Sequence, residues 1–271
     1  MSRPLLVVDG DSLAHRAYHG LPKSVRLNAV VGFTNMLVRL WESEEPRAVF
    51  VGWDTLTVPT YRHEALEGYQ AGRVFDKSLL EQLDMLPELV RSLGFAAAKE
   101  DGYEADDFLG AAVRFEEKRG GTAVVATSDR DSFQLASDQT TIITPVRGVS
   151  ELTRIGPVEV RERYGVEPAQ VPDFIALRGD PSDKIPGAPG VGPKTAASIL
   201  KQYGSLDAAL EAGRFPNLRE ELELYRRIAT LDASAPLPPL KDQSPAWAEA
   251  SSLLESWGLG NLAGRIAARS A

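Results

Sequence analysis

The stretch Gly102-Tyr103-Glu104-Ala105-Asp106-Asp107 is the part of the sequence that decides the fold and the site. It places Glu104, Asp106 and Asp107 in the opening turn of a segment, 105–113, whose apolar residues recur at helical spacing. The helix dipole explains one acid in a first turn, since it offers about 1 kcal/mol or less. Three acids in four residues repel one another. The pattern therefore predicts an amphipathic helix whose N-terminus faces a positive charge, most simply a metal ion.

Composition restricts the chemistry that the chain can perform. Its 271 residues are enough for a sizeable core, and they include no cysteine and only three histidines, His15, His19 and His63. This excludes disulfides, thiolate zinc sites and a cysteine nucleophile. A metal would then be bound by oxygen, which favours Mg²⁺ or Mn²⁺.

The N-terminus carries no sign of secretion. Met1 to Pro4 leads directly into the apolar run Leu5 to Val8, without the length or the cleavage region of a signal peptide. No apolar run has the length of a membrane span. With the missing cysteines, this predicts a cytoplasmic protein with no membrane partner.

Strands and helices alternate over the first half of the chain, which predicts an α/β fold. Strands are expected at 5–8, 48–54, 122–127 and 142–145, and helices at 13–18, 28–41 and 76–93 as well as at the acidic segment. We therefore expect a central, mostly parallel sheet flanked by helices over residues 1–154 and a helical region over residues 155–271.

Two segments depart from these patterns. Residues 55–75 are polar and lack apolar periodicity, so we expect a mobile segment over the active face. Residues 233–245 are rich in proline and predict an extended linker, after which residues 252–268 form a last amphipathic piece.

Acidic residues follow three of the predicted strands. Asp9, Asp54 and Asp129 stand at strand ends, and in an open α/β sheet the carboxyl ends of parallel strands border the functional crevice. For Asp11 a helix cap or turn is the favoured interpretation. Adding the other acids of the motifs gives nine candidates for one pocket: Asp9, Asp54, Glu104, Asp106, Asp107, Asp129, Asp131, Asp180 and Asp183.

A ring of carboxylates without histidine or cysteine is suited to phosphoryl transfer or hydrolysis. Two ions held by such a ring can activate a water and stabilise the leaving oxygen of a phosphodiester. The formal net charge of −8 would ordinarily argue against a DNA partner, but setting nine cluster acids aside brings it to about +1. The acidic balance therefore does not exclude DNA.

The second motif is Gly190-Val191-Gly192-Pro193-Lys194-Thr195-Ala196. A tight glycine turn that opens a helix presents backbone N–H groups to a phosphate, and Lys194 adds a charge. With helices expected at 171–177 and 196–203, it predicts a helix-hairpin-helix that binds the DNA backbone through Gly190, Val191, Gly192, Lys194 and Thr195.

These motifs, taken in order, resemble those of the bacterial 5′ nucleases, the flap endonuclease superfamily. The chain is most similar to the N-terminal 5′-to-3′ exonuclease domain of bacterial DNA polymerase I. The resemblance rests on Val8-Asp9-Gly10, Arg62-His63-Glu64, Gly102 to Asp107, Thr127-Ser128-Asp129-Arg130-Asp131, Gly179-Asp180-Pro181-Ser182-Asp183 and Gly190 to Ala196. Because no polymerase or proofreading domain follows Ala271, a stand-alone member is expected.

The resemblance implies a PIN/FEN-like fold and a divalent-metal nuclease that cuts 5′ flaps and nicked or gapped duplexes. It implies that the nine acids bind two or more Mg²⁺ or Mn²⁺ ions and position water, and that residues 55–75 form a helical arch. There Arg62 and Arg73 would hold phosphate and Tyr69 would stack on a base. It further implies a K⁺ site at the hairpin, a functional link to a DNA polymerase and ligase, and a cytoplasmic or nucleoid-associated monomer.

Two residues depart from the family pattern. Tyr69-Gln70 stands where the arch usually reads Tyr-Lys, and Lys184 follows Asp183 where Asn is frequent. The usual arch lysine supplies positive charge at the scissile phosphate. Our hypothesis is that Arg73, or a metal-bound water, replaces it; Lys184 either contacts phosphate or, as the commoner alternative, is a solvated surface residue.

Two other functions remain as alternatives. Gln70 leaves room for a structure-specific DNA-binding module with weak or no catalysis. Asp9-Gly10-Asp11 after the first strand is also compatible with a phosphatase that forms a phospho-aspartate. In that scheme the later hairpin and the many acids would have no role.

Overall fold

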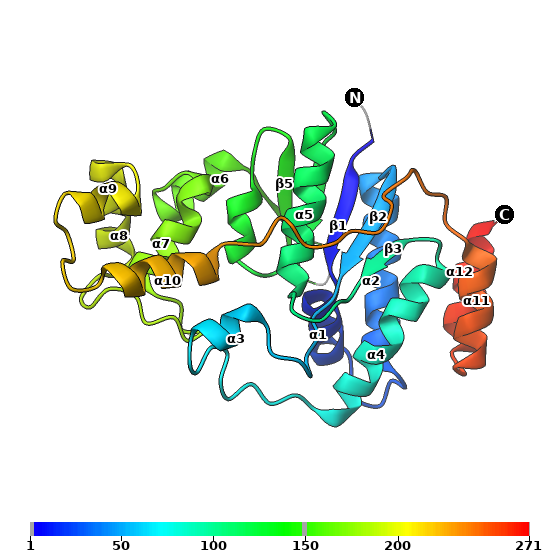
Figure 1. Cartoon of the computed structure of the whole chain (residues 1–271). Helices are drawn as coiled ribbons and strands as arrows, with labels where there is room; N and C mark the ends of the chain where they lie inside the picture. Colours follow the sequence, from blue (N-terminus) through cyan, green and yellow to red (C-terminus); the bar gives the residue numbers. More distant parts are fainter. Residues whose placement is uncertain (1–2, 148–150, 271) are drawn as a thin grey trace.

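The computed structural model describes residues 3–147 and 151–270, and a six-stranded sheet lies at its centre (Figure 1). Its order is β3-β2-β1-β4-β5-β6, and β6 alone runs antiparallel to its neighbour. The strands are β1 (Leu5–Asp9), β2 (Ala48–Gly52), β3 (Ala96–Ala98), β4 (Ala123–Ala126), β5 (Thr140–Arg147) and β6 (Glu151–Ile155). The predicted mostly parallel sheet is confirmed.

The central strand β1 is buried on both faces, which explains its continuous apolar sequence. Leu5 and Val7 belong to one hydrophobic core, whereas Leu6 and Val8 belong to the other. In the register with β2, Asp9 is level with Gly52. The register thus brings the polar residues that follow these strands to one edge of the sheet.

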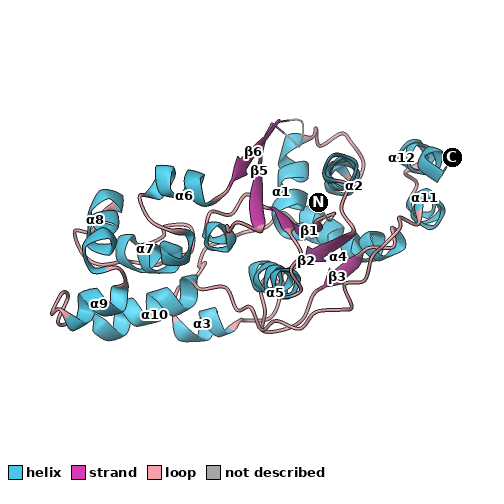
Figure 2. Cartoon of the chain, turned by 90° about the horizontal axis from the view of Figure 1, so that it is seen from above, coloured by secondary structure: helices cyan, strands magenta, loops and turns pink. Residues whose placement is uncertain are grey.

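Helices cover both faces of the sheet (Figure 2). The core on one face contains α1 (Gly10–Gly20), α2 (Asn28–Glu44) and α4 (Lys77–Ser92). On the other face lies the acidic helix α5 (Ala105–Lys118), as the apolar spacing predicts. None of the helices in the described ranges is both long and apolar enough to cross a membrane.

The helical region extends the core on the α5 side. It contains α6 (Pro157–Tyr164), α7 (Val171–Arg178), α8 (Pro193–Tyr203), α9 (Leu206–Glu211) and α10 (Arg219–Ala229). Two short 3₁₀ helices contact each other: Asp131–Leu135, which follows β4 and contacts β5 and α7, and Pro168–Gln170, which lies between α6 and α7. The predicted helices on either side of the hairpin, α7 and α8, are both present.

The last residues leave the helical region and pack against helices of the first half of the chain. After the extended segment that follows α10, two helices, α11 (Trp247–Ser256) and α12 (Gly260–Ala267), pack in the core of α2 and α4 (Figure 1). The rings of Trp41 and Trp247 lie 5.2 Å apart. The apolar face of this pair is buried against the first half of the chain.

Three further elements differ from the sequence expectations. β3 consists of three alanines and β6 is half exposed, so neither has the apolar, β-branched pattern of a buried strand. The polar segment 55–75 contains a short helix, α3 (Tyr61–Ala65), and its base is packed against the rest of the molecule as described below.

Candidate active site

The ends of β1, β2 and β4 supply three carboxylates to one place. Asp9 caps α1 by accepting a hydrogen bond from Ser12 N (2.9 Å), and it also accepts one from Thr127 Oγ1 (2.7 Å). Asp54 follows β2 and Asp129 follows β4. The convergence expected for the carboxyl ends of parallel strands is present.

The N-terminus of α5 adds Glu104 and Asp106. It approaches β2 closely at Gly52, where a Cβ atom would lie 2.9 Å from the carbonyl oxygen of Ala105. A side chain there would push the helix away from the strand. The approach lets Asp54 accept a hydrogen bond from Ala105 N (2.6 Å), so the strand end and the helix N-terminus are fixed together.

These residues open into a cavity of about 680 Å³. The carboxylates that line it are those of Asp9, Asp11, Asp54, Asp76, Glu104, Asp106, Asp129, Asp131 and Asp183. All of the predicted acids except Asp107 and Asp180 are therefore brought together here. Arg62 and Arg73 also border the cavity, although Arg62 is engaged elsewhere.

The crowding of these acids changes their protonation. Desolvation in the enclosed cavity raises the pKa of Asp9 from 3.8 to about 7, and desolvation followed by the charge of Asp129 raises the pKa of Asp183 to about 6. The same two causes, in the same order, raise the pKa of Asp106 and Asp131. The fully ionised cluster is therefore unfavourable, and binding of protons or cations stabilises it.

The donor set fits a hard divalent cation, because its ligands are carboxylate oxygens. Several of these oxygens now accept hydrogen bonds from the protein: Asp129 accepts from Asp131 N at 2.9 Å, and Asp11 accepts from Asp54 N at 2.8 Å. Over residues 3–147 and 151–270, no three such side chains are set to hold an ion as they stand.

We expect the metal-free protein to lose stability between pH 5.5 and pH 8. The folded chain keeps protons on acids such as Asp9 and Asp183 where the unfolded chain has lost them. This stabilisation is complete below the ordinary value of 3.8 and is lost as the pH rises through about 6 to 7. Each excess proton lowers the free energy of unfolding by about 1.4 kcal/mol per pH unit.

Urea unfolding in EDTA measures this loss, and the same titration in millimolar Mg²⁺ is the control. Mg²⁺ should restore stability at pH 8 and change it little at pH 5.5, because protons compete with the ion at low pH. Equal stability at both pH values in EDTA would contradict the expectation.

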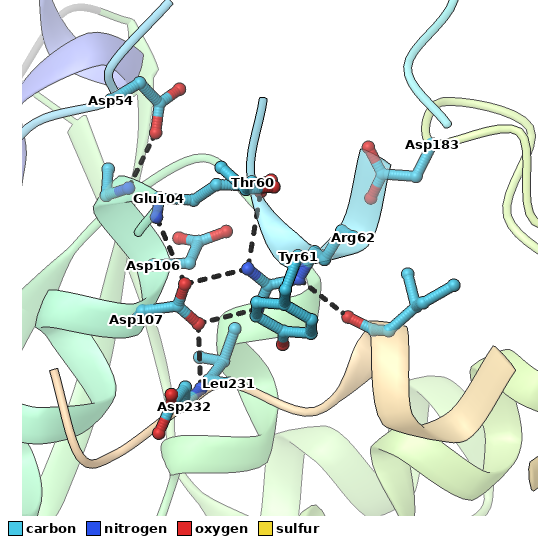
Figure 3. A network of polar contacts seen from close by, with 12 residues as sticks. Asp54, Thr60, Tyr61, Arg62, Glu104, Asp106, Asp107, Asp183, Leu231 and Asp232 are labelled. Carbon is cyan, nitrogen blue, oxygen red and sulfur yellow. Dashed lines mark hydrogen bonds and ion pairs between the residues drawn. The ribbon is translucent and has the colours of Figure 1, made fainter. Parts of the chain in front are cut away.

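Asp107 does not face the cavity. It is fully buried and forms a bidentate ion pair with Arg62, Oδ2 to Nη1 at 2.8 Å and Oδ1 to Nη2 at 2.6 Å (Figure 3). It also accepts hydrogen bonds from the backbone N–H groups of Glu104 (3.1 Å) and Asp232 (2.8 Å). Asp107 is therefore not placed to bind a metal ion, because both of its carboxylate oxygens accept hydrogen bonds from protein donors.

Arg62 likewise is not placed to hold DNA phosphate. Its side chain is 2% exposed, and its Nε donates to the carbonyl oxygen of Ile228 (2.9 Å). Nη1 also lies 3.7 Å from Glu104 Oε2. Arg62 thus joins three parts of the chain: α3 at the base of segment 55–75, the N-terminus of α5, and the residues that end α10.

Tyr69 is buried too, so it is not available to stack on a base. Its hydroxyl donates to Glu104 Oε2 (3.1 Å), and its ring packs edge-on against His63, with centroids 5.1 Å apart. Gln70 and Arg73 lie beside it. Gln70 Nε2 donates to Asp183 Oδ1 (3.2 Å), and Arg73 Nη2 donates to the same oxygen (2.9 Å).

Asp180 lies beside the cavity rather than in it. It accepts hydrogen bonds from Arg178 Nη2 (3.0 Å) and Ser182 N (2.8 Å). The turn that carries it is closed by paired hydrogen bonds between Asp180 and Ile185. Lys184 in this turn is exposed, with the left-handed φ of 62° that Asn tolerates better than Lys.

The predicted hairpin is exposed between α7 and α8. Gly190 has a φ of 75° and no atom near the position of a Cβ, while Gly192, Lys194 and Thr195 are exposed at the start of α8. Val191 is half-buried and packs against the core. Val191 N donates to the carbonyl oxygen of Ala188 (3.0 Å), so the part of this turn that a partner can reach consists of the exposed residues Gly190, Gly192, Lys194 and Thr195.

Sequence reasoning missed two residues of the site. Asp11 was expected to be a cap, but Asp9 is the cap of α1, and Asp11 accepts a hydrogen bond from Asp54 N in the cavity wall. Thr60 donates to Glu104 Oε1 (2.8 Å). The signal for Asp11 was its place two residues after a strand-end acid; nothing local marked Thr60.

A mostly parallel sheet thus carries an acid-lined cavity at its carboxyl edge and is joined to a helical region with an exposed hairpin. The chain belongs to the 5′-3′ exonuclease family. The N-terminal resolvase-like domain of the 5′-3′ exonucleases matches residues 4–165, and their C-terminal SAM fold matches residues 166–250.

Curated relatives and solved structures agree with this membership. DNA polymerase I of Mycobacterium leprae is 43% identical over 76% of this chain and 24% of its own length, and that of Bacillus caldotenax is 38% identical over 85% and 27%. The chain thus spans about a quarter of the length of these relatives.

Two solved structures share the fold. T5 5′-exonuclease with bound divalent zinc ions has a TM-score of 0.74 at 20% identity, covering 97% of this chain and 98% of that one. The catalytic core of Rad2 in complex with DNA substrate has a TM-score of 0.62 at 15% identity, covering 98% and 91%. The predicted resemblance is confirmed.

Proposed function

We propose that the protein is a structure-specific 5′ nuclease that hydrolyses phosphodiester bonds in 5′ flaps and in nicked or gapped duplex DNA. The observation that carries the proposal is the cavity in which acids from three strand ends and the α5 N-terminus meet. The T5 protein has been solved with divalent ions and with DNA, and the Rad2 core with DNA substrate, which supports the same partners here.

The proposed cofactors are two or more Mg²⁺ or Mn²⁺ ions. When bound, they supply charge that stabilises the phosphate during hydrolysis and lowers the pKa of water. Asp9, Asp54, Glu104, Asp106, Asp129, Asp131 and Asp183 would hold them. Asp180 would join after releasing Arg178, since both of its oxygens now accept hydrogen bonds.

The remaining residues would orient the DNA. The hairpin would hold the downstream duplex through its backbone N–H groups, and Arg73, the partly exposed cation at Asp183, would contact the scissile strand. As the relatives are DNA polymerase I chains, we propose that the protein acts beside a polymerase and a ligase in replication or repair, as a monomer.

Cleavage of a flap duplex labelled at its 5′ end, in Mg²⁺ or Mn²⁺ and in EDTA, tests this function. Release of the labelled flap in either ion and none in EDTA is the expected result. Ion-dependent binding without release would favour the DNA-binding module instead. Turnover of a small phosphate monoester without flap cleavage would favour the phosphatase.

The departure at Gln70 has its own expected result. Because Arg73 already places a cation on the oxygen of Asp183 that Gln70 contacts, Gln70→Lys should leave the single-turnover rate nearly unchanged. Arg73→Ala should lower it roughly 10- to 100-fold, as expected for the loss of one charged hydrogen bond. A large gain from Gln70→Lys would show instead that the positive charge is missing.

A further inference from the structure

A smaller pocket opens beside the active-site cavity. Its volume is about 370 Å³, and it shares Asp129 and Asp131 with the cavity. Arg130 and Arg178, from two different elements, form part of its wall; we call it the arginine pocket. Because the two spaces have acids in common, an occupant of the arginine pocket would lie next to the reacting group of a bound substrate.

Arg178 is held in place on two sides, yet it is not fully used. Its guanidinium lies over the ring of Phe174, 5.3 Å from the centroid, and Nη2 donates to Asp180 Oδ2 (3.0 Å). Among the described residues its buried Nε has no hydrogen-bond partner. A planar guanidinium that lines the pocket and is held by a ring and a carboxylate is suited to an anion with several oxygens.

Arg130 supplies the second charge from the turn that follows β4. The residue is exposed, and the turn is fixed by the hydrogen bond from Asp131 N to Asp129 Oδ1 (2.9 Å). The side chain of Arg130 therefore starts from a rigid position between two cavity acids. It is free to reach toward an anion at the pocket.

The charges around the arginine pocket indicate that an anion would bind there only when divalent ions are present. Without cations, Asp129, Asp131 and Asp180 outnumber the two arginines, so an anion would be repelled. Divalent ions held by the shared acids would remove that repulsion and would draw Asp180 away from Arg178. The arginines would then be the charges left to meet a phosphate.

We propose that the arginine pocket binds a backbone phosphate of the substrate strand adjacent to the phosphate that is cut. The inference rests on the proposed function and deepens it, because it assigns Arg130 and Arg178 to the register of the strand in the site. These residues fix which phosphodiester reaches the acids.

The test combines two arginine variants with DNA that lacks one charge. Binding of intact flap DNA is measured by fluorescence anisotropy in Ca²⁺ at several salt concentrations, with gels to verify that the DNA stays whole. Arg130→Ala and Arg178→Ala should each weaken binding about 3- to 10-fold and lower the salt slope by about 1. Arg163→Ala is the matched control, since Arg163 lies over Phe133 (5.9 Å) but does not line the pocket.

Single neutral methylphosphonates along the strand then identify the phosphate. A methylphosphonate at one position next to the cut should weaken binding by the wild-type protein. The same methylphosphonate should weaken binding by Arg178→Ala little further, because that variant has already lost the contact. Arg130→Ala, an exposed substitution, gives the same test should Arg178→Ala disturb the turn. Single-turnover cleavage of unmodified flap should show cuts shifted along the strand in either variant.

Unchanged salt slopes and unchanged cut positions in both arginine variants would contradict the proposal that the arginine pocket binds a backbone phosphate. If those variants still cut flaps as the wild type does, the proposed function stands without it. A wild-type protein that neither binds nor cuts flaps would overturn the pocket and the proposed function together.

Discussion

Asp106→Asn and Asp129→Asn are expected to lower the single-turnover rate of flap cleavage roughly 10²- to 10⁴-fold. This factor corresponds to the loss of several kcal/mol of ion-dependent stabilisation of the transition state. The same variants should leave the metal-free protein at least as stable as the wild type. Desolvation and neighbouring carboxylates raise the pKa of both residues, so each charge destabilises the metal-free fold. Removing one charge relieves repulsion.

Two measurements on each variant check this pair of effects: the cleavage rate in saturating Mg²⁺ and the midpoint of urea unfolding in EDTA at pH 8. Asp84→Asn is the matched control, since Asp84 is 77% exposed on α4 and far in sequence from the acid motifs. Stability that falls along with activity would show that Asp106 and Asp129 hold the fold together instead of serving the site.

The convergence of most acids was predictable because it follows from topology. Asp9, Asp54 and Asp129 each come after an apolar strand, and parallel strands end at one edge. The acidic helix was predictable from its spacing, whereas the parallel strand β3 that precedes it and turns its N-terminus toward that edge was not expected. Patterns of this kind lie within short windows of sequence.

The positions that were predicted wrongly depend on contacts between distant residues. Arg62 and Asp107 are 45 residues apart, and no local pattern shows that one arginine takes both oxygens of that acid. The three acids at the N-terminus of α5 look alike in sequence, yet a single residue step along the helix, a rotation of about 100°, directs Asp107 away from Asp106. The packing of α11 on α2 and α4 likewise includes the contact of Trp247 with Trp41, 206 residues earlier in the chain.

The second large effect concerns this buried pair. Asp107→Asn and Arg62→Met should each lower the free energy of unfolding by about 3–5 kcal/mol, because each leaves a buried charge without its partner. The double variant Arg62→Met/Asp107→Asn should lose less than the sum of the two single losses, since no charge is then left alone. Urea unfolding of the three variants measures these losses.

The ion dependence of cleavage separates this structural role from the metal role that the sequence favoured. At a temperature where Asp107→Asn is still folded, its half-saturating Mg²⁺ concentration should match that of the wild type. The reason is that Asp107 accepts hydrogen bonds from Arg62, Glu104 N and Asp232 N and does not line the cavity. The variant Asp106→Asn, one residue away, should instead need a much higher Mg²⁺ concentration for its remaining cleavage.

A raised Mg²⁺ requirement in Asp107→Asn, with unchanged stability, would show that Asp107 is a metal ligand after all. Arg62 joins α3 to the end of α10 and to Glu104, so the role assigned to the pair is to hold these elements together and not to bind ions.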